Sequence, residues 1–509
     1  MNIRLFCKLS TGLVLSSVIV FQAIGAKPEY KNKRPNLIFV FSDQQSFDML
    51  GCYGNKEIKT PNLDKLANEG VRFNHCISSC PVCTPYRSML LSGLHPLKNG
   101  AIVNDIQMLQ GNGNYLGEVL RDAGYHTGYY GKWHLYGGDR ERPIPEGPFR
   151  YGFDNEFLSN NCTMLYDSGR SYFWNENGEK TLYGDWEWKA QSRQALDFLD
   201  KNAGKDKPIA MFLSWHAPHD WMAGGVREHK YSAPQHLEAQ YDLNSIVLRK
   251  NCVDTERHRK YYQGHMAMVT SLDEDFGLIM KKLENLEIAD NSVIIFTSDH
   301  GDLLESHNWP FNKGRPEIES IRVPLIIKFP GQKAARVSEL LVGTLDLMPT
   351  VLGLLGIKEP KTCDGKNLAD EIYRGNDKAV KSVPLFYFAG DWRGVYTHQY
   401  TYTFALPGGA AEPHAVKSGF LDNSVLYCHT EDPFELNNLF NNPEYLKQKE
   451  KLHQQASKWM KKFNDKGIPS GNLIPKVMYE DDYNITKLPH PQKPKGFETK
   501  LKGRPVDYQ

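Results

Sequence analysis

The sequence predicts an α/β protein built on a largely parallel or mixed β-sheet, with a smaller second domain toward the C-terminus. Up to residue 364, short continuous apolar runs typical of buried parallel strands alternate with helical patterns. Four of these runs end directly in clusters of metal-ligand or acid–base residues. After residue 364 the pattern changes to alternating strands and one polar amphipathic helix, which predicts the second domain.

The predicted strands of the large domain share one feature, a polar cluster at the C-terminal end. The strands are residues 37–41, 125–130, 209–213 and 293–296. The clusters are Ser42-Asp43-Gln44, Gly131-Lys132-Trp133-His134, Trp215-His216-Ala217-Pro218-His219 and Ser298-Asp299-His300-Gly301. In open α/β sheets, sites form at the carboxyl ends of the strands, so the shared pattern predicts a site at that edge.

Helical patterns lie between these strands. Thr60 and Pro61 predict the start of one helix, as its cap and first residue, and Gly70 predicts its end. Further helices are expected over residues 115–122, 191–201 and 257–286. In the second domain, we expect antiparallel strands within 383–387 and 394–405, a helix over 445–463, and an irregular proline- and lysine-rich tail from residue 488.

Charge and composition exclude several classes of protein. The 61 lysines and arginines nearly cancel the 60 aspartates and glutamates, so no overall field favours nucleic acid or an acidic membrane. Hydrophobic residues make up 40% of the chain and aromatic residues 12%, as in globular proteins. Nine cysteines are too few for a disulfide scaffold, although the sequence is compatible with one or two disulfide bridges.

The first 26 residues are typical of a signal peptide. Arg4 and Lys8 precede an apolar run over residues 13–20, and the small pair Gly25-Ala26 follows it. A membrane anchor is the alternative, but the run is short for a bilayer crossing. We therefore expect an exported protein, periplasmic or secreted, without stable membrane insertion. Residues 27–380 are the expected catalytic domain and residues 381–509 the smaller domain with its tail.

Two cysteines lie three residues apart, at Cys80 and Cys83. The spacing suits a metal or redox pair, and a buried core thiol is a second structural interpretation of Cys83. Pro85 and Arg87 follow Cys83 and favour a different chemistry. Cys83-Thr84-Pro85-Tyr86-Arg87, with Ser88 and Leu91-Ser92-Gly93 after it, resembles the signature of the type I, formylglycine-dependent sulfatases.

Further segments match this family in the same order, so the resemblance covers nearly all of the chain beyond the signal peptide. Residues 124–135 resemble the second sulfatase signature, and the other matches are residues 36–43, 60–64, 216–219, 297–301, 313–314, 321–324, 346–350 and 431–435. Many ordered matches are far more specific than a lone CxPxR pattern. The resemblance implies an alkaline-phosphatase-like fold: a large domain with a mixed, mostly parallel sheet, and a smaller domain with an antiparallel sheet and a helix.

The resemblance also implies a modified residue. In this family a formylglycine-generating enzyme oxidises the motif cysteine, here Cys83, to an aldehyde before the chain folds. One hydroxyl of the hydrated aldehyde attacks sulfur and displaces the alcohol, and the other allows the intermediate to expel sulfate. A serine would be left as a stable sulfate ester.

One divalent cation is the implied cofactor. Its expected ligands are Asp43, Gln44, Asp299, His300 and an oxygen of residue 83. Hard oxygen ligands favour Ca²⁺, with Mg²⁺ as the alternative. Gln44 stands where a second aspartate is common and His300 where many members have asparagine, and the first change removes a negative charge.

The resemblance assigns the remaining roles residue by residue. Arg87 holds the formylglycine and the carboxylates of the metal site. Lys132 contacts sulfate and residue 83, while His134 takes the diol proton that releases sulfate. His219 binds sulfate and protonates the leaving group. Lys313 contacts sulfate and assists the departure of the leaving group. His307 is either near the substrate or structural, and His216 is expected to be a supporting residue.

The segments expected to choose the substrate are residues 139–174, 221–241 and 403–414, whose aromatic residues suit either a carbohydrate groove or packing. The leading hypothesis is an exported sulfatase that acts on a sulfated carbohydrate. The alternative enzymes are a phosphodiester or phosphonate monoester hydrolase and an aryl- or choline-type small-molecule sulfatase. A glycan-binding protein with an unconverted cysteine and a redox protein using Cys80 and Cys83 are more distant hypotheses.

Overall fold

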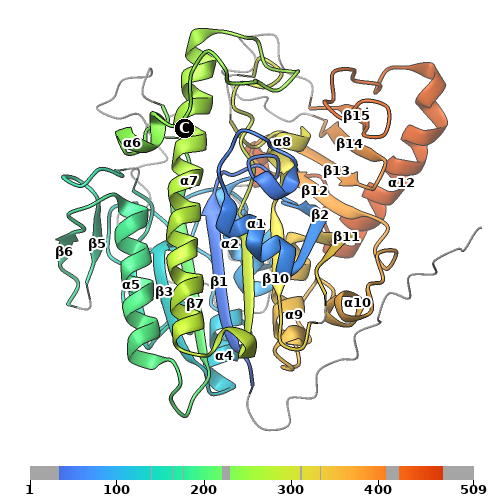
Figure 1. Cartoon of the computed structure of the whole chain (residues 1–509). Coiled ribbons are helices and arrows are strands. Elements are labelled where there is room, and N and C mark those ends of the chain that lie inside the picture. The colour runs from blue at the N-terminus through green and yellow to red at the C-terminus, as the bar shows by residue number, and fades with distance from the viewer. Residues whose placement is uncertain are drawn as a thin grey trace, which may run out of the picture.

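Figure 1 shows a computed structural model of the chain, which describes residues 34–473 except 139, 164, 176, 221–229, 310–311, 333 and 408–422. The expected signal peptide, the irregular tail and parts of the three expected substrate segments therefore lie outside the described residues. Of the helices that are described, none combines the length and the hydropathy that crossing a bilayer requires.

A sheet of eleven strands forms the centre of the molecule, in the order β11-β2-β10-β8-β1-β7-β3-β4-β5-β6, with β9 paired to β2. The strands are β1 (Asn36–Asp43), β2 (Val71–Ile77), β3 (His126–Lys132), β4 (Glu156–Asn160), β5 (Tyr172–Trp174), β6 (Lys180–Leu182), β7 (Ile209–Pro218), β8 (Ser292–Ser298), β9 (Arg322–Val323), β10 (Leu325–Lys328) and β11 (Arg336–Gly343). The run from β8 through β1, β7 and β3 to β4 is parallel, while β10, β9, β5 and β6 pair antiparallel. The predicted mixed, mostly parallel sheet is confirmed.

Helices cover both faces of this sheet (Figure 1). They are α1 (Pro61–Glu69), α2 (Cys83–Ser92), α3 (Pro96–Asn99), α4 (Leu116–Asp122), α5 (Glu187–Asn202), α6 (Gln235–Glu238), α7 (Glu256–Asn285), α8 (Ile318–Ile321), α9 (Thr344–Leu354) and α10 (Ala369–Arg374). Helix α1 begins at Pro61 and is followed by Gly70, as the sequence predicts. The Thr60 hydroxyl accepts a hydrogen bond from the Gly51 amide instead of capping the helix.

The position of strand β1 between two layers of helices explains why its sequence is continuously apolar. Leu37, Phe39 and Phe41 belong to the hydrophobic cluster that includes α2 and α9, whereas Ile38 and Val40 belong to the cluster that includes α5 and α7. Successive side chains of a strand point to opposite faces of the sheet, and both faces are covered here. The strand therefore has a fixed position between two layers of helices, and so does the polar end that follows it.

A second sheet of four antiparallel strands confirms the predicted smaller domain. Its strands are β12 (Val383–Tyr387), β13 (Trp392–Tyr396), β14 (Tyr400–Ala405) and β15 (Val425–Cys428), and helix α12 (Leu446–Phe463) packs on it. The predicted run over residues 394–405 is a hairpin, which turns between β13 and β14. Phe386, Trp392 and Phe463 share a hydrophobic cluster with the large sheet, so the two sheets pack on a common core. The boundary at residue 380 stays a prediction.

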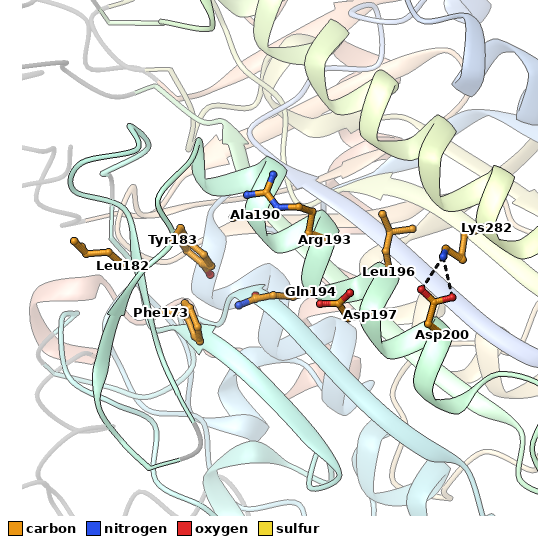
Figure 2. Close-up of a pocket in the computed structure, with 10 residues that line it drawn as sticks. All are labelled: Phe173, Leu182, Tyr183, Ala190, Arg193, Gln194, Leu196, Asp197, Asp200 and Lys282. Carbon is orange, nitrogen blue, oxygen red and sulfur yellow. Dashed lines mark hydrogen bonds and ion pairs between the residues drawn. The ribbon is translucent and has the colours of Figure 1, made fainter.

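A surface pocket of about 450 Å³ lies between the β5–β6 hairpin and α5 (Figure 2). The rings of Phe173 and Tyr183 stack 4.9 Å apart on one side of it. On the other side Lys282 donates to both carboxylate oxygens of Asp200, at 2.8 and 2.7 Å. The pocket shares no residue with the site described next.

Candidate active site

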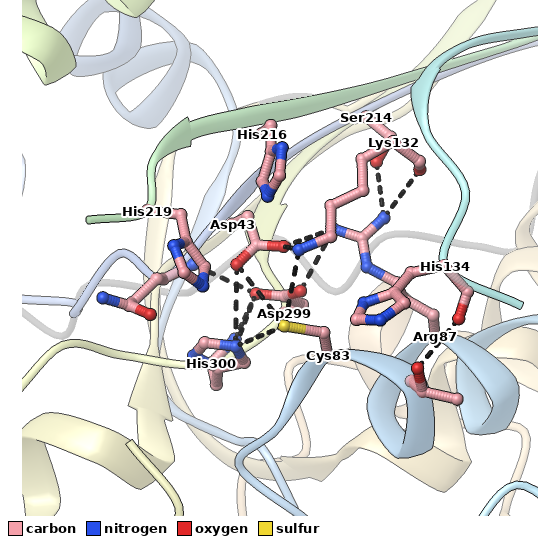
Figure 3. Close-up of polar contacts among 12 residues, drawn as sticks. Asp43, Cys83, Arg87, Lys132, His134, Ser214, His216, His219, Asp299 and His300 are labelled. Atoms are coloured by element: carbon pink, nitrogen blue, oxygen red, sulfur yellow. Dashed lines mark hydrogen bonds and ion pairs between the residues drawn. The ribbon is translucent and has the colours of Figure 1, made fainter. Parts of the chain in front are cut away.

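The four predicted polar clusters meet at one edge of the central sheet, as the parallel order of β8, β1, β7 and β3 requires. Asp43 ends β1, Lys132 ends β3, and Asp299 and His219 come directly after β8 and β7. The N-terminus of α2 brings Cys83 to the same edge. Figure 3 shows these side chains turned toward one another.

Cys83 lies at the centre of the cluster, with 1% of its surface exposed. Its Sγ is 3.3 Å from His300 Nε2, 3.4 Å from Lys313 Nζ and 3.5 Å from Lys132 Nζ. Burial alone would raise the pKa of this thiol, but Lys132, Lys313 and His300 outweigh it and hold the pKa well below its ordinary value. The position at Sγ therefore favours negative charge.

Cys80 lies in a different environment, although it is only three residues away. It is fully buried in the hydrophobic core, and burial raises the pKa of its thiol. All eight cysteines in the described part of the chain are free. The structure thus places Cys80 among apolar side chains and Cys83 among cations, and does not join them.

Arg87, one helical turn after the motif cysteine, connects the ends of three strands. Its Nη2 donates to Asp43 Oδ2 at 2.8 Å and to Asp299 Oδ2 at 3.1 Å. Its Nη1 donates to the Lys132 carbonyl at 2.8 Å and to Ser214 Oγ at 2.7 Å. Charge-assisted hydrogen bonds of this kind are the stronger ones, and here they compensate two buried carboxylates.

Four side chains of the cluster form a donor set that fits a cation. Asp43, Cys83, Asp299 and His300 each contribute one ligand atom, and these atoms lie within 4.8 Å of one another. His300 Nδ1 donates to the Gly301 carbonyl at 3.1 Å, which leaves Nε2 facing the site. Burial and the neighbouring Asp43 raise the pKa of Asp299 to about 6, although His300 and Arg87 oppose the shift.

Gln44, the remaining predicted ligand, adjoins this donor set, since its backbone N–H donates to Asp299 Oδ1 at 3.1 Å. Its Nε2 donates to Asp220 Oδ1 and to Asp302 Oδ2, both at 2.8 Å. Its Oε1 is buried and makes no hydrogen bond with any described residue. Because the two carboxylates fix which way the amide lies, the unpaired atom is an oxygen, the ligand type that Ca²⁺ and Mg²⁺ prefer. Gln44 itself carries no negative charge, but its amide is bonded to two carboxylates, Asp220 and Asp302, which supply negative charge close to the site.

Lys132 and Asp43 form a buried ion pair beside Cys83. Lys132 Nζ donates to Asp43 Oδ2 at 2.6 Å, and both side chains are fully buried. Burial and Cys83 would raise the pKa of Asp43, but Lys132, His219 and Arg87 outweigh them and hold that pKa well below its ordinary value. The pair is therefore ionised, which keeps a fixed positive charge next to residue 83.

His134 is held by two residues that the sequence analysis did not identify. Its Nε2 lies 3.0 Å from Asp105 Oδ1, and Arg140 donates to both oxygens of Asp105 at 2.8 Å. His134 Nδ1 is buried and has no hydrogen-bond partner among the described residues. Burial lowers the pKa of His134, but the thiol of Cys162 and the bond to Asp105 raise it to about 10. The bond of Nε2 to Asp105 leaves Nδ1 as the ring nitrogen without a described partner.

His219 and Lys313 face residue 83 from the opposite side. His219 Nδ1 lies 2.8 Å from the Asp220 carbonyl, to which it donates, so Nε2 faces Lys313 Nζ in a short hydrogen bond. Lys313 Nζ also reaches Cys83 Sγ. His216 lies behind this pair, fully buried, with its ring 5.3 Å from that of His219. The structure thus brings together every predicted site residue except His307.

His307 has other neighbours. Its Nε2 lies 3.0 Å from Asn251 Nδ2 and 3.3 Å from Glu319 Oε2, and the structure gives it no bond to the Cys83 cluster. Its predicted contact with substrate stays a prediction.

Comparison with known proteins gives consistent matches along the chain. The family model described as "Sulfatase" matches residues 35–357, and the model described as "N-sulphoglucosamine sulphohydrolase, C-terminal" matches residues 306–462. The chain is 31% identical to an ulvan-active sulfatase of Formosa agariphila, over 94% of this chain and 92% of that protein. It is 26% identical to an endo-4-O-sulfatase of Bacteroides thetaiotaomicron, over 88% of this chain and 96% of that protein.

A solved structure gives the same result for the fold. The crystal structure of a putative sulfatase from Bacteroides fragilis is 27% identical to this chain, with a TM-score of 0.76. The match covers 87% of this chain and 99% of that one.

Arg87→Met tests how far the buried carboxylates depend on the guanidinium. We expect the free energy of unfolding to fall by about 3–5 kcal/mol, because the substitution leaves Asp43 and Asp299 without their shared partner. Urea denaturation measures this. Arg193→Met removes an ion pair to Asp185 at the surface, with side chains 53% and 34% exposed, and should cost about 0–1 kcal/mol. Equal losses in the two variants would contradict the compensating role of Arg87.

Proposed function

The chain belongs to the sulfatase family and is a sulfuric ester hydrolase, and on that premise we propose that it removes sulfate from a sulfated carbohydrate. We further propose that it uses an aldehyde made from Cys83 and one bound divalent cation. The observation that carries the proposal is the convergence of Lys132, Lys313 and His300 on Cys83 Sγ within 3.5 Å. The names of two relatives, an ulvan-active sulfatase and an endo-4-O-sulfatase, support a glycan substrate.

The cluster suits a sulfate ester because a sulfate carries negative charge on its free oxygens. Lys132 and Lys313 place two cationic groups within 3.5 Å of Cys83 Sγ, and residue 83 is the first residue of α2, where the helix dipole also favours negative charge. These groups are already in place before substrate arrives. Fixed positive charge of this kind stabilises the additional charge of the transition state.

Residue 83 and the cation supply the chemistry that the remaining side chains serve. A hydrated aldehyde at residue 83 provides one hydroxyl to attack sulfur and a second whose proton can be removed afterwards. A divalent cation, Ca²⁺ first and Mg²⁺ as the alternative, would be held by Asp43, Gln44, Asp299 and His300 and would polarise oxygens that it contacts. The Cys83 Sγ marks where those hydroxyls would lie.

His219 and Lys313 serve the leaving group. When the bond between sulfur and the alcohol oxygen breaks, that oxygen needs a proton. The hydrogen bond between Lys313 Nζ and His219 Nε2 lets the two residues share one, and the Asp220 carbonyl holds the histidine ring so that Nε2 faces the site. General acid catalysis by such a pair contributes about 10²–10⁴-fold.

His134 serves the second step. In its neutral form, with Nε2 bonded to Asp105, His134 can accept the proton of the second hydroxyl on residue 83 at Nδ1. The carbon–oxygen double bond of the aldehyde then forms again as the bond to the sulfate oxygen breaks, and sulfate leaves. Asp105 is a positioning residue in this scheme, because it fixes the tautomer and orientation of the imidazole.

Maturation and export belong to the same proposal. A formylglycine-generating enzyme would act on the residue 83 segment before folding, since Cys83 is buried in the folded chain. Export to the periplasm or the outside of the cell is proposed from residues 1–26 and would bring the enzyme to polymeric substrates.

The aldehyde is the first test. Protein produced in a host with a maturation enzyme should react with a hydrazide probe at the peptide that contains residue 83, and mass spectrometry locates the label. Cys83→Ala should lose the label and lower the rate of desulfation by at least about a thousand-fold, since the nucleophile is gone. Cys80→Ala is the matched control and should keep the label. Full activity in the Cys83→Ala protein would refute the proposal.

Cation binding is tested at Gln44. Gln44→Leu keeps the size of the side chain but removes Oε1, so we expect Ca²⁺ affinity measured by equilibrium dialysis to fall about 10-fold or more. Gln194→Leu changes a glutamine that also has an unpaired buried Oε1, but outside the cluster, and should bind Ca²⁺ like the wild type. Unchanged affinity in Gln44→Leu would remove Gln44 from the ligand set.

The leaving-group role of His219 is tested with two substrates. His219→Asn should lower kcat/KM for a sugar sulfate by about 10²–10⁴-fold, because the sugar alkoxide needs a proton. Nitrophenyl sulfate leaves as a stable phenolate, so the loss with that substrate should be much smaller. Equal losses on both substrates would show that His219 acts in binding and not as the acid.

Asp105→Asn tests the positioning of His134. We expect kcat to fall by about 10²–10⁴-fold with KM little changed, because the amide no longer enforces the tautomer that frees Nδ1. Nitrogen NMR of the imidazole should show the change of tautomer directly. A variant with normal kcat would contradict the assigned role, whatever its stability.

A further inference from the structure

A second cluster of ligand-type side chains lies where the large sheet meets the smaller one. His307 precedes α8, Glu319 lies within α8, and Glu435 follows β15. Each contributes one ligand atom, and these atoms lie within 4.8 Å of one another. The two glutamates are buried, at 3% and 1% exposure, and the His307 side chain is 11% exposed. None of the three touches Cys83 or its neighbours through a hydrogen bond or ion pair recorded for the described residues.

Arg315, in the segment before α8, does not balance the negative charge of this second cluster. Arg315 donates to both oxygens of Glu317, at 3.1 and 3.0 Å, and that carboxylate is thereby satisfied. Glu319 and Glu435 remain as two buried carboxylates beside the imidazoles of His307 and His429. Buried carboxylates need a proton, a paired cation or a bound metal.

Glu435 has one carboxylate oxygen that is buried and unpaired. Its Oε2 accepts a hydrogen bond from the Ile318 amide at 2.8 Å. Its Oε1 is buried and makes no hydrogen bond with any described residue. The nearest imidazole, His429, lies 3.5 Å away, but its Nε2 is bonded to Thr401 Oγ1 at 2.8 Å, so that nitrogen already has a partner other than the carboxylate.

Asn251 provides a fourth ligand from the large domain. Its Nδ2 lies 2.6 Å from Glu319 Oε1, 3.0 Å from His307 Nε2 and 2.9 Å from the Phe434 carbonyl, while its Oδ1 is buried without a described partner. The amide N–H₂ of Asn251 thus lies among three acceptors. Half a turn of the amide would direct Oδ1 to the same place.

We propose that His307, Glu319, Glu435 and Asn251 Oδ1 bind a divalent transition-metal ion of the zinc class. One imidazole nitrogen with two carboxylates and an amide oxygen is a donor set that suits Zn²⁺ better than Ca²⁺, which prefers six to eight oxygens. The ion links α8 and the loop before it to the segment after β15, so it fastens the smaller sheet to the large domain. His307 is then a metal ligand, and it is the metal that explains its place beside the two glutamates.

Metal analysis of the full chain tests this proposal. Protein stripped with a chelator and dialysed against Zn²⁺ should retain about one tightly bound equivalent at this site. The experiment uses the Asp299→Asn background, which weakens the cation site at Cys83, so zinc bound there does not confuse the count. In that background Glu435→Gln should lose the equivalent, and Glu431→Gln, on the same segment and bonded to Tyr445, should keep it.

Two further readouts keep the test decisive if Glu435→Gln folds poorly. Zn²⁺ should raise the Tm of the Asp299→Asn protein by several degrees. The Tm of the double variant, which carries Asn251→Leu as well, should be nearly unchanged by Zn²⁺. Co²⁺ in place of zinc should give visible absorption bands that His307→Asn abolishes. Zinc retention equal in the Glu435→Gln and Glu431→Gln proteins, or no zinc in either, would overturn the proposal. Neither result depends on the aldehyde or on sulfatase activity.

Discussion

The contact between the Arg87 guanidinium and the carboxylates of Asp43 and Asp299 is the constraint on which the rest of the site depends. Strands β1 and β8 are apolar because both faces of the sheet are covered, yet each delivers a carboxylate into the interior. Two such charges side by side destabilise a fold unless a fixed cation lies between them. Arg87 also donates to the Lys132 carbonyl at the end of β3 and to Ser214 of β7, so a single side chain bonds to groups from four neighbouring strands.

The same compensation of charge explains how a strongly charged cluster is stable although its side chains are buried. Lys132 balances Asp43, and Gln44 directs its amide hydrogens to Asp220 and Asp302. The surplus positive charge on Lys132 and Lys313 faces residue 83. A sulfate group entering this position would exchange its hydration for groups already oriented toward it. In this arrangement stability and the proposed chemistry use the same charges.

Much of this could be predicted from the sequence, because the strands that carry the site are buried on both faces and stand out as apolar runs. Their ends then place Asp43, Lys132, His219 and Asp299 together by topology alone. Asp105 and Arg140 could not be found in this way, since both lie outside helices and strands and no periodic pattern marks them. Gln44 is bonded to Asp220 and Asp302, which lie 176 and 258 residues further along the chain. From the sequence one could see that Gln44 removes a negative charge, but not that these two carboxylates lie beside it. Strands β2, β10 and β11 were not predicted, because they form through pairing with strands that are distant in the sequence. Strand formation in general depends on such neighbours.

The shared core of the two sheets has a consequence for the timing of synthesis. The Trp392 indole of β13 donates to the carbonyl of Gly314, next to Lys313, across 78 residues of chain. A ribosome adds about 5–20 residues per second, so on the order of ten seconds separates the appearance of Lys313 from that of its anchor. During that interval the nascent chain carries residue 83 and the strand ends but has no fixed lysine opposite them. The C-terminal sheet therefore completes the site, because the segment that carries Lys313 gains this anchor only after residue 392 has been made.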